Sequence, residues 1–261
     1  MEEIYDDGQV KLVNDDCLSA LLDVEDNSVD MVFADLPYGY FKKTINWDDR
    51  IPFEPLWDQL LRVGKDKCAF IFTATQPFTT DLILSQRTLL KYVLVWDKGR
   101  GNEPQLANRR PMKRHEDIVV FCRTQTIYNP QMELLDKPYH KVTNASPNNL
   151  NGKGQNILST RWVPGEVRTY THKYPTSIIQ FPNPNGKNLK INPTQKPLAL
   201  LEWLINTYTD EDMLVLDPTF GSATTALACI RTKRQFTGME KDPEMFQLAC
   251  ERLEKCLKME L

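Results

Sequence analysis

Residues 29–40 read VDMVFADLPYGY, an apolar, strand-like run that ends in an acid, a proline and an aromatic ring. The carboxylate of Asp35 is a hydrogen-bond acceptor, and the ring of Tyr38 offers a flat surface for stacking. Together the two side chains could hold a planar base by its amino group. A surface turn is the simpler interpretation, and this stretch alone leaves both open.

A second acid, Asp217, ends another apolar run in residues 213–225, MLVLDPTFGSATT. Ligands of parallel α/β sheets lie beyond the carboxyl ends of the strands. Gly221 would let the backbone approach a ligand closely, and Ser222 would cap the following helix. The glycines of a dinucleotide site are missing, which disfavours a nicotinamide-dependent enzyme and suits a single nucleoside with an amino-acid tail.

Glu240 follows the next strand-like run. An acid there can accept hydrogen bonds from both hydroxyls of a ribose. It can equally cap a helix that begins near Pro243, and the sequence does not choose between these two roles.

The acids need a sheet to bring them together, and strand-like segments alternate with helix-like segments on both sides of an irregular stretch. We predict strands over residues 10–14, 29–34, 67–73, 92–96, 116–121, 213–216 and 236–239. We predict helices over residues 53–63, 77–85, 198–208, 222–231 and 243–257. This order indicates an α/β fold with helices on both faces of one sheet.

Residues 124–191 interrupt that alternation. They are rich in Asn, Pro, Gly and Thr, with short strands expected only at 160–163 and 177–180. The sequence thus predicts one domain in two pieces, residues 1–123 and 192–261, with residues 124–191 as a loop-rich insertion. An irregular stretch of this length inside a compact protein is usually functional or disordered.

Composition narrows the class of protein. The 261 residues are 41% hydrophobic and 26% charged with a net charge of −3, values typical of a globular protein. The acidic start lacks the apolar core of a secretory signal and no run is long enough to span a membrane, so we expect a cytoplasmic protein. Six scattered cysteines and three separated histidines favour reduced thiols and no metal centre.

The negative net charge hides a basic segment. Between residues 137 and 196 a single acid, Glu166, accompanies nine basic residues: Lys137, Lys141, Lys153, Arg161, Arg168, Lys173, Lys187, Lys190 and Lys196. This pattern is compatible with a DNA-binding face and also with a solvated loop.

Three motifs in this order resemble those of the β-group amino-methylating DNA methyltransferases: DLPY at 35–38, NPTQKP at 192–197 and DPTFGSATT at 217–225. The similarity extends through NDDC, WDKGR and RHEDIVVF and skips the insertion. It implies a Rossmann-like methyltransferase sheet with a permuted motif order, S-adenosylmethionine as the cofactor and double-stranded DNA as the partner. Homodimers occur among related enzymes, so the oligomeric state stays open.

The resemblance assigns the first motif to catalysis. It implies that Asp35 and the backbone carbonyl of Leu36 accept the two amino hydrogens of a flipped base, that Pro37 holds the turn, and that Tyr38 stacks on the base. Leu36 stands where the family usually has proline. Asp at the first position goes more often with adenine N6 than with cytosine N4, so adenine is our first expectation. Cytosine N4 and a catalytically silent DNA-binding protein are the alternatives.

Cofactor binding is implied for the later motifs. Asp217, Phe220, Gly221 and Ser222 match the cofactor motif, with Thr219 and Ala223 as departures from its usual Phe and Gly. Ala223 should suit a helix better than Gly. The resemblance also places Thr194 and Lys196 near the methionine tail, Glu240 at the ribose and Asp16 near the cofactor adenine. Capping of a helix is the alternative for Asp16.

DNA contact is implied for the insertion and for a second basic cluster near the flipped base. The residues concerned are Arg109, Arg110, Lys113, Arg114, Arg161, Arg168 and Lys173. An exposed, solvated side chain is the alternative for each of them.

Overall fold

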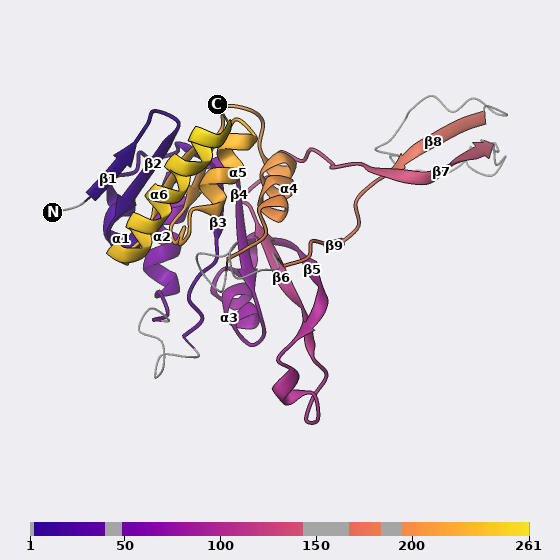
Figure 1. Cartoon of the computed structure of the whole chain (residues 1–261), viewed down its shortest axis with the longest axis horizontal. Helices are drawn as coiled ribbons and strands as arrows, with labels where there is room; N and C mark the ends of the chain where they lie inside the picture. Colours follow the sequence, from indigo (N-terminus) through magenta and orange to yellow (C-terminus); the bar gives the residue numbers. More distant parts are fainter. Residues whose placement is uncertain (1–2, 40–48, 143–166, 184–194, 261) are drawn as a thin grey trace. The chain divides into compact units, whose positions relative to one another are not determined.

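A computed structural model of the chain describes residues 3–39, 49–142, 167–183 and 195–260. The chain divides into a large unit, residues 1–129 with 176–261, and a small unit, residues 130–175. The large unit holds a nine-stranded sheet in the order β1-β2-β11-β10-β3-β4-β6-β5-β9, and the small unit holds the pair β7-β8 (Figure 1).

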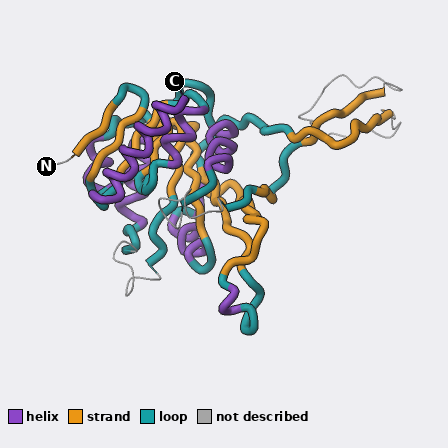
Figure 2. The backbone as a smooth tube through the Cα atoms, viewed as in Figure 1, coloured by secondary structure: helices purple, strands orange, loops and turns teal. Residues whose placement is uncertain are grey.

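The strands of the large unit are β1 (Glu3–Asp6), β2 (Val10–Asn14), β3 (Val29–Ala34), β4 (Gly64–Ala74), β5 (Leu90–Asn102), β6 (Lys113–Phe121), β9 (Ile178–Gln180), β10 (Leu214–Asp217) and β11 (Gln235–Met239). Its helices are α1 (Cys17–Ala20), α2 (Phe53–Val63), α3 (Phe78–Ser85), α4 (Leu198–Tyr208), α5 (Thr224–Arg231) and α6 (Pro243–Glu260). The elements can be traced by type in Figure 2.

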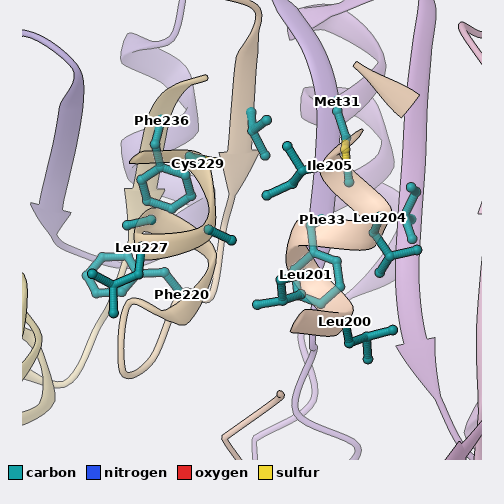
Figure 3. Packing of buried hydrophobic residues seen from close by; sticks show 14 of the residues in the cluster. Met31, Phe33, Leu200, Leu201, Leu204, Ile205, Phe220, Leu227, Cys229 and Phe236 are labelled. Atoms are coloured by element: carbon teal, nitrogen blue, oxygen red, sulfur yellow. The ribbon is translucent and has the colours of Figure 1, made fainter. Parts of the chain in front are cut away.

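Alternation along the central strands separates two hydrophobic cores. In β3, Met31 and Phe33 point into a core that is closed by α4, α5 and α6, while Val32 and Ala34 point into a core closed by α1, α2 and α3. Figure 3 shows the first of these cores, where Phe33 lies beside Leu201 of α4. Because both faces are covered, the central strands are mostly apolar, as the sequence indicated. The predicted α/β sheet with helices on both faces is confirmed.

The centre of the sheet joins segments that are distant in the sequence. Strand β10 pairs in parallel with β3, with Val215 opposite Met31, and β11 pairs in parallel with β2. The carboxyl ends of β2, β11, β10 and β3 therefore meet at one edge of the sheet. This edge is where a parallel α/β sheet binds its ligands.

Two strand pairings were not predicted from the sequence. Strand β1 pairs antiparallel with β2 at the edge of the sheet, although its EIYD sequence is half acidic. Such charge is tolerated there because an edge strand faces solvent on one side. In the small unit β7 (Glu133–Val142) pairs antiparallel with β8 (Val167–Lys173), within the stretch that we expected to be irregular. The strand expected at 160–163 lies outside the described residues.

Among the described helices, none is both long and apolar enough to cross a membrane. All six cysteines are free thiols.

Candidate active site

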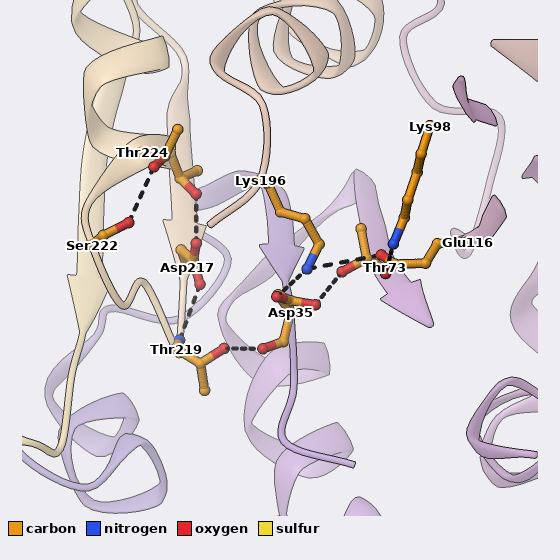
Figure 4. Close-up of polar contacts among 10 residues, drawn as sticks. Asp35, Thr73, Lys98, Glu116, Lys196, Asp217, Thr219, Ser222 and Thr224 are labelled. Atoms are coloured by element: carbon orange, nitrogen blue, oxygen red, sulfur yellow. Dashed lines mark hydrogen bonds and ion pairs between the residues drawn. The ribbon is translucent and has the colours of Figure 1, made fainter. Parts of the chain in front are cut away.

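Two acids stand side by side at the ligand-binding edge of the sheet. Asp35 follows β3 directly, and Asp217 is the last residue of the neighbouring parallel strand β10. The hydroxyl of Thr219 donates a hydrogen bond to the backbone carbonyl of Asp35 at 3.3 Å, which ties the two strand ends together (Figure 4). The early and late sequence motifs thus form one site.

The carboxylate of Asp35 is held by two donors. One oxygen accepts a hydrogen bond from the hydroxyl of Thr73, which is buried in the adjacent strand β4. The other accepts from the ammonium group of Lys196, ahead of α4. The Asp35 side chain remains 26% exposed, so it is reachable by a ligand.

Lys196 belongs to a row of alternating charges that we call the charge row: Lys98, Glu116, Lys196 and Asp35. Lys98 of β5 pairs with Glu116 of β6, and Lys196 lies 3.9 Å from the other oxygen of Glu116 as well as pairing with Asp35. The side chains of Lys98 and Lys196 are only 9% and 10% exposed. Each ammonium is thus beside a carboxylate, as buried charges require.

The charge row favours the ionised forms of Glu116 and Lys196. Burial by itself would raise the pKa of Glu116, but the ammonium groups of Lys196 and Lys98 outweigh it and leave that pKa below its usual value. Burial likewise opposes the charged form of Lys196, yet the carboxylates of Asp35 and Glu116 raise its pKa. The resemblance linked Lys196 to the methionine tail of the cofactor. In the structure it lies on Asp35, and the link to the cofactor stays a prediction.

The rest of the DLPY motif lies over an aromatic patch. Leu36 is buried, at 3% exposure, and the ring of Tyr38 packs against that of Phe78 with 4.8 Å between centroids. The guanidinium of Arg50 covers the rings of Phe53 and Phe78 at 4.8 and 5.2 Å. The patch therefore supports the half-buried ring of Tyr38 from behind and places a cation near it, which suits stacking of a base on Tyr38.

Asp217 is enclosed by the loop that follows it. One carboxylate oxygen accepts from the backbone N–H of Thr219 at 3.0 Å, and the other from the hydroxyl of Thr225 at 2.6 Å. Burial raises the pKa of Asp217 to about 7, although both hydrogen bonds work against that rise. The carboxyl group thus shapes the loop between β10 and α5 from inside.

Glu240 accepts a hydrogen bond from the turn in the same loop. Gly221, with a positive φ of 55°, donates its backbone N–H to one oxygen of Glu240 at 3.0 Å, and Asp242 donates its N–H to the other at 2.8 Å. Burial raises the pKa of Glu240 above its ordinary value. The first turn of α6 is capped by Asp242, which accepts from the N–H groups of Glu244 and Met245, so the capping alternative for Glu240 is wrong. Its role at a ribose stays a prediction.

Two expectations about the loop at Ser222 are wrong. Helix α5 begins at Thr224 without a side-chain cap, and the hydroxyl of Ser222 lies 3.2 Å from that of Thr224 instead of capping the helix. Ala223 is not helical: its φ of 56° is left-handed, a conformation that glycine adopts more readily. The family's usual glycine at this position thus has a conformational reason. The buried ring of Phe220 packs near Phe246 of α6.

The carboxylate of Asp16 caps α1 by accepting from the N–H of Leu18 at 3.0 Å, and it also pairs with Lys241. The capping alternative is therefore confirmed for Asp16, and contact with a cofactor adenine stays a prediction. Thr194 lies outside the described residues.

The residues predicted to contact DNA fall into two groups. Arg109, Arg110, Lys113 and Arg114 lie at the far end of the long β5–β6 ribbon, where Arg110 pairs with Glu103 and Arg114 makes two hydrogen bonds to Asp97. Arg168 and Lys173 are in β8, where Lys173 pairs with Glu133 of β7. Arg161 lies outside the described residues. Nearby acids thus offset part of the positive charge that the sequence displays.

Sequence reasoning missed Thr73, Lys98 and Glu116 as members of the site. Glu116 stands within the RHEDIVVF segment and Lys98 within WDKGR, both of which were noted only as similar to the family. The signal that could have found Lys98 and Glu116 was a pair of opposite charges, one in each of these two segments. Within the described parts of the chain, no group of three or more His, Cys, Asp or Glu side chains could hold a metal ion.

A family model described as DNA methylase matches residues 29–251 of this chain. Type II methyltransferase M.HpaI of Haemophilus parainfluenzae is 26% identical over 254 residues, which cover 94% of this chain and 74% of that protein. Type II methyltransferase M1.MboII of Moraxella bovis is 25% identical over 249 residues, with 87% and 90% covered.

Solved structures share the fold. The M1.HpyAVI–SAM complex aligns with a TM-score of 0.62 at 22% identity, over 94% of this chain and 98% of that one. The PvuII DNA methyltransferase, titled cytosine-N4-specific, aligns with a TM-score of 0.61 at 16% identity, over 93% and 86%. The expected Rossmann-like methyltransferase fold is confirmed.

Proposed function

Because the chain belongs to the DNA methylase family, we propose that it transfers a methyl group from S-adenosylmethionine to the N6 amino group of adenine in double-stranded DNA. The observation that carries this proposal is the position of Asp35 at the strand end beside Asp217, partly exposed and next to an aromatic patch. Methyl transfer to the amino group of a base needs three features in one place: an acid, an aromatic side chain and a loop that binds the cofactor.

The residues at the ends of β2, β11 and β10 fit S-adenosylmethionine. Each carboxylate oxygen of Glu240 accepts one backbone N–H, and a carboxylate oxygen has two acceptor sites. One site on each oxygen is thus left for the two hydroxyls of a ribose. Gly221 supplies the close backbone approach, and Asp16 stands at the end of β2. When bound, the cofactor supplies an electrophilic methyl group on a positively charged sulfur.

Asp35 orients and activates the nucleophile. The lone pair of the adenine amino nitrogen is delocalised into the ring, so the nitrogen attacks poorly unless its hydrogens are held. The Asp35 carboxylate and the Leu36 carbonyl would accept those two hydrogens and aim the nitrogen at the methyl carbon. The bound cofactor would supply the methyl group and keep the carbon–sulfur bonding pair on its sulfur. Asp35 would accept the proton that the methylated nitrogen gives up.

The target base must leave the duplex to reach Asp35. Tyr38, backed by the buried ring of Phe78, would stack on the base, a contact worth roughly 1–3 kcal/mol per base in comparable platforms. The basic residues Arg109, Arg110, Lys113 and Arg114 of the β5–β6 ribbon, with Arg161, Arg168 and Lys173 of the insertion, are the proposed contacts to DNA.

The test uses methyl-labelled S-adenosylmethionine, unmethylated bacterial DNA and mass analysis of the digested nucleosides. We expect labelled N6-methyladenine from the native protein and from Asp58→Ala, which removes an exposed acid of α2. Asp35→Ala should give none while it still binds the cofactor. Labelled N4-methylcytosine would overturn the choice of base. A native protein that labels no nucleoside would overturn the proposed activity.

A further inference from the structure

One oxygen of Glu116 is unusual for a buried carboxylate. Its partner oxygen accepts a hydrogen bond from Lys98, but Oε2 is shielded from solvent and has no hydrogen-bond donor among the described residues. Buried polar atoms are nearly always hydrogen-bonded, so an unused carboxylate oxygen indicates a donor that reaches it in another state of the site.

The ammonium group of Lys196 lies close to that oxygen. Its Nζ lies 3.9 Å from Glu116 Oε2 while it donates to Asp35 Oδ2 (Figure 4). Charge-assisted hydrogen bonds span about 2.7–2.9 Å, so a shift of about 1 Å would complete a bond to Glu116. The lysine side chain has a flexible stem and three donor hydrogens, which makes such a shift easy.

The present position of Lys196 interferes with the proposed reaction. It takes one of the two acceptor sites of Asp35 Oδ2, and its positive charge offsets the carboxylate charge that would draw electron density onto the nitrogen. The hydroxyl of Thr73 already occupies the other oxygen of Asp35. Each oxygen keeps one acceptor site, but the full carboxylate charge acts on the base amino group only after Lys196 moves.

We propose that Glu116 is a positioning residue, which receives the ammonium group of Lys196 when the target base enters and so frees Asp35 for the base amino group. This inference rests on the proposed methyl transfer. Lys98 holds the Glu116 carboxylate in place, and its own ammonium lies 4.9 Å from the ring of Trp96. Because Lys196 moves between two members of the charge row, the total buried charge does not change.

A simpler role for Glu116 is to neutralise Lys98. The two roles predict different behaviour when both members of that pair are removed. The variant K98M/E116Q leaves one ammonium, Lys196, and one carboxylate, Asp35, so it buries no unpaired charge. It should therefore fold even where Glu116→Gln alone, which leaves two ammonium groups beside one carboxylate, does not.

The experiment measures the single-turnover rate of methyl transfer to unmethylated bacterial DNA, together with the Kd for S-adenosylmethionine and for that DNA. The variants are Glu116→Gln and K98M/E116Q. The matched control is Glu202→Gln, which removes a partly buried carboxylate that pairs with Arg231 of α5. The control should keep the native rate because Glu202 is outside the charge row.

We expect the rate to fall by about 10- to 100-fold in both Glu116 variants, with both Kd values within about twofold of native. A native rate in K98M/E116Q would overturn the inference, because Glu116 would then only neutralise Lys98. A rate loss accompanied by equally weakened cofactor binding would also overturn it, since that is the signature of a structural role. If the native protein itself transfers no methyl group, the proposed function fails and the inference fails with it.

Discussion

Asp35 and Asp217 end neighbouring parallel strands, yet their carboxyl groups have opposite surroundings. Asp35 is partly exposed and pairs with the ammonium group of Lys196. Asp217 is 2% exposed and accepts from a hydroxyl and a backbone N–H, with no cation paired to it among the described residues. Two aspartates at neighbouring strand ends therefore differ. Asp35 is ion-paired and open to a ligand, whereas Asp217 is buried and holds the loop that follows it.

The contrast teaches that position in the sheet brings an acid to the site, while its neighbours decide what the acid does. The two parallel strands bring both carboxyl groups to the same edge of the sheet. Burial without a cation favours the neutral form of Asp217, whereas the ammonium group of Lys196 and the hydroxyl of Thr73 donate to Asp35. Substitutions at the two acids should accordingly affect different properties.

The largest difference should come from replacing each acid by its amide. Asp35→Asn keeps the shape but removes the charge that activates the amino group, and we expect methyl transfer to slow by about 100- to 1000-fold. Asp217→Asn should leave the rate within about threefold of native, because its carboxyl group faces the loop. Single-turnover rates on the same DNA test both statements, and equal losses in the two variants would erase the distinction.

The next effect concerns stability and pH. Burial raises the pKa of Asp217 to about 7 from an ordinary value of 3.8, so the folded protein binds a proton there more tightly than the unfolded chain does. The stability gained is complete below about pH 4 and is lost as the pH rises through about 7. From about pH 5 to about pH 8, the native protein should lose about 2–3 kcal/mol relative to Asp217→Asn. Urea denaturation of both proteins at the two pH values measures this difference. Equal changes in the free energy of unfolding of the two proteins would contradict the prediction.

A smaller effect is expected from Thr225, which donates its hydroxyl to Asp217 at 2.6 Å. Thr225→Val leaves a buried carboxyl oxygen without its donor and should lower the free energy of unfolding by about 1–2 kcal/mol. Thr88→Val is the control, since that hydroxyl makes an exposed hydrogen bond to Gln86. A loss in Thr225→Val no larger than in the control would show that the hydroxyl does not brace the loop.

The smallest effect should follow Ala223→Gly. Glycine relieves the left-handed backbone at φ 56°, worth about 1–2 kcal/mol, but it loses a buried methyl group and gains freedom in the unfolded chain. These terms oppose one another, so the free energy of unfolding, measured by thermal unfolding, should change by less than about 1 kcal/mol. Ala223→Val should destabilise clearly, because a branched side chain fits that backbone conformation poorly. A stable valine variant would mean that the loop can rearrange.

Much of the sheet was predictable because its signals are local. The apolar runs ending at Asn14 and Ala34 and the helical spacing from Phe53 to Val63 each have the bounds that periodicity gave. Asp35 and Asp217 were singled out because an acid after an apolar strand is conspicuous. Their closeness followed from the rule that parallel strands meet at one edge.

What escaped prediction depends on contacts between distant segments. Lys196 and Asp35 are 161 positions apart, and nothing near either residue signals their pairing. Strands β7 and β8 do not alternate regularly between apolar and polar residues, so periodicity did not reveal them in the sequence. Ala223 was assigned to a helix because propensity favours it there, whereas the turn after Gly221 sets its backbone.

The order of strands also constrains how the chain folds as it is made. Strand β2 and strand β3 are not neighbours, because β11 and β10 lie between them in the sheet. Until residues 214–239 have been synthesised, the inner edges of β2 and β3 have no partner strands, and such edges invite association with other chains. The central sheet can therefore close only after most of the chain has been synthesised, and until then its open strand edges are at risk of association.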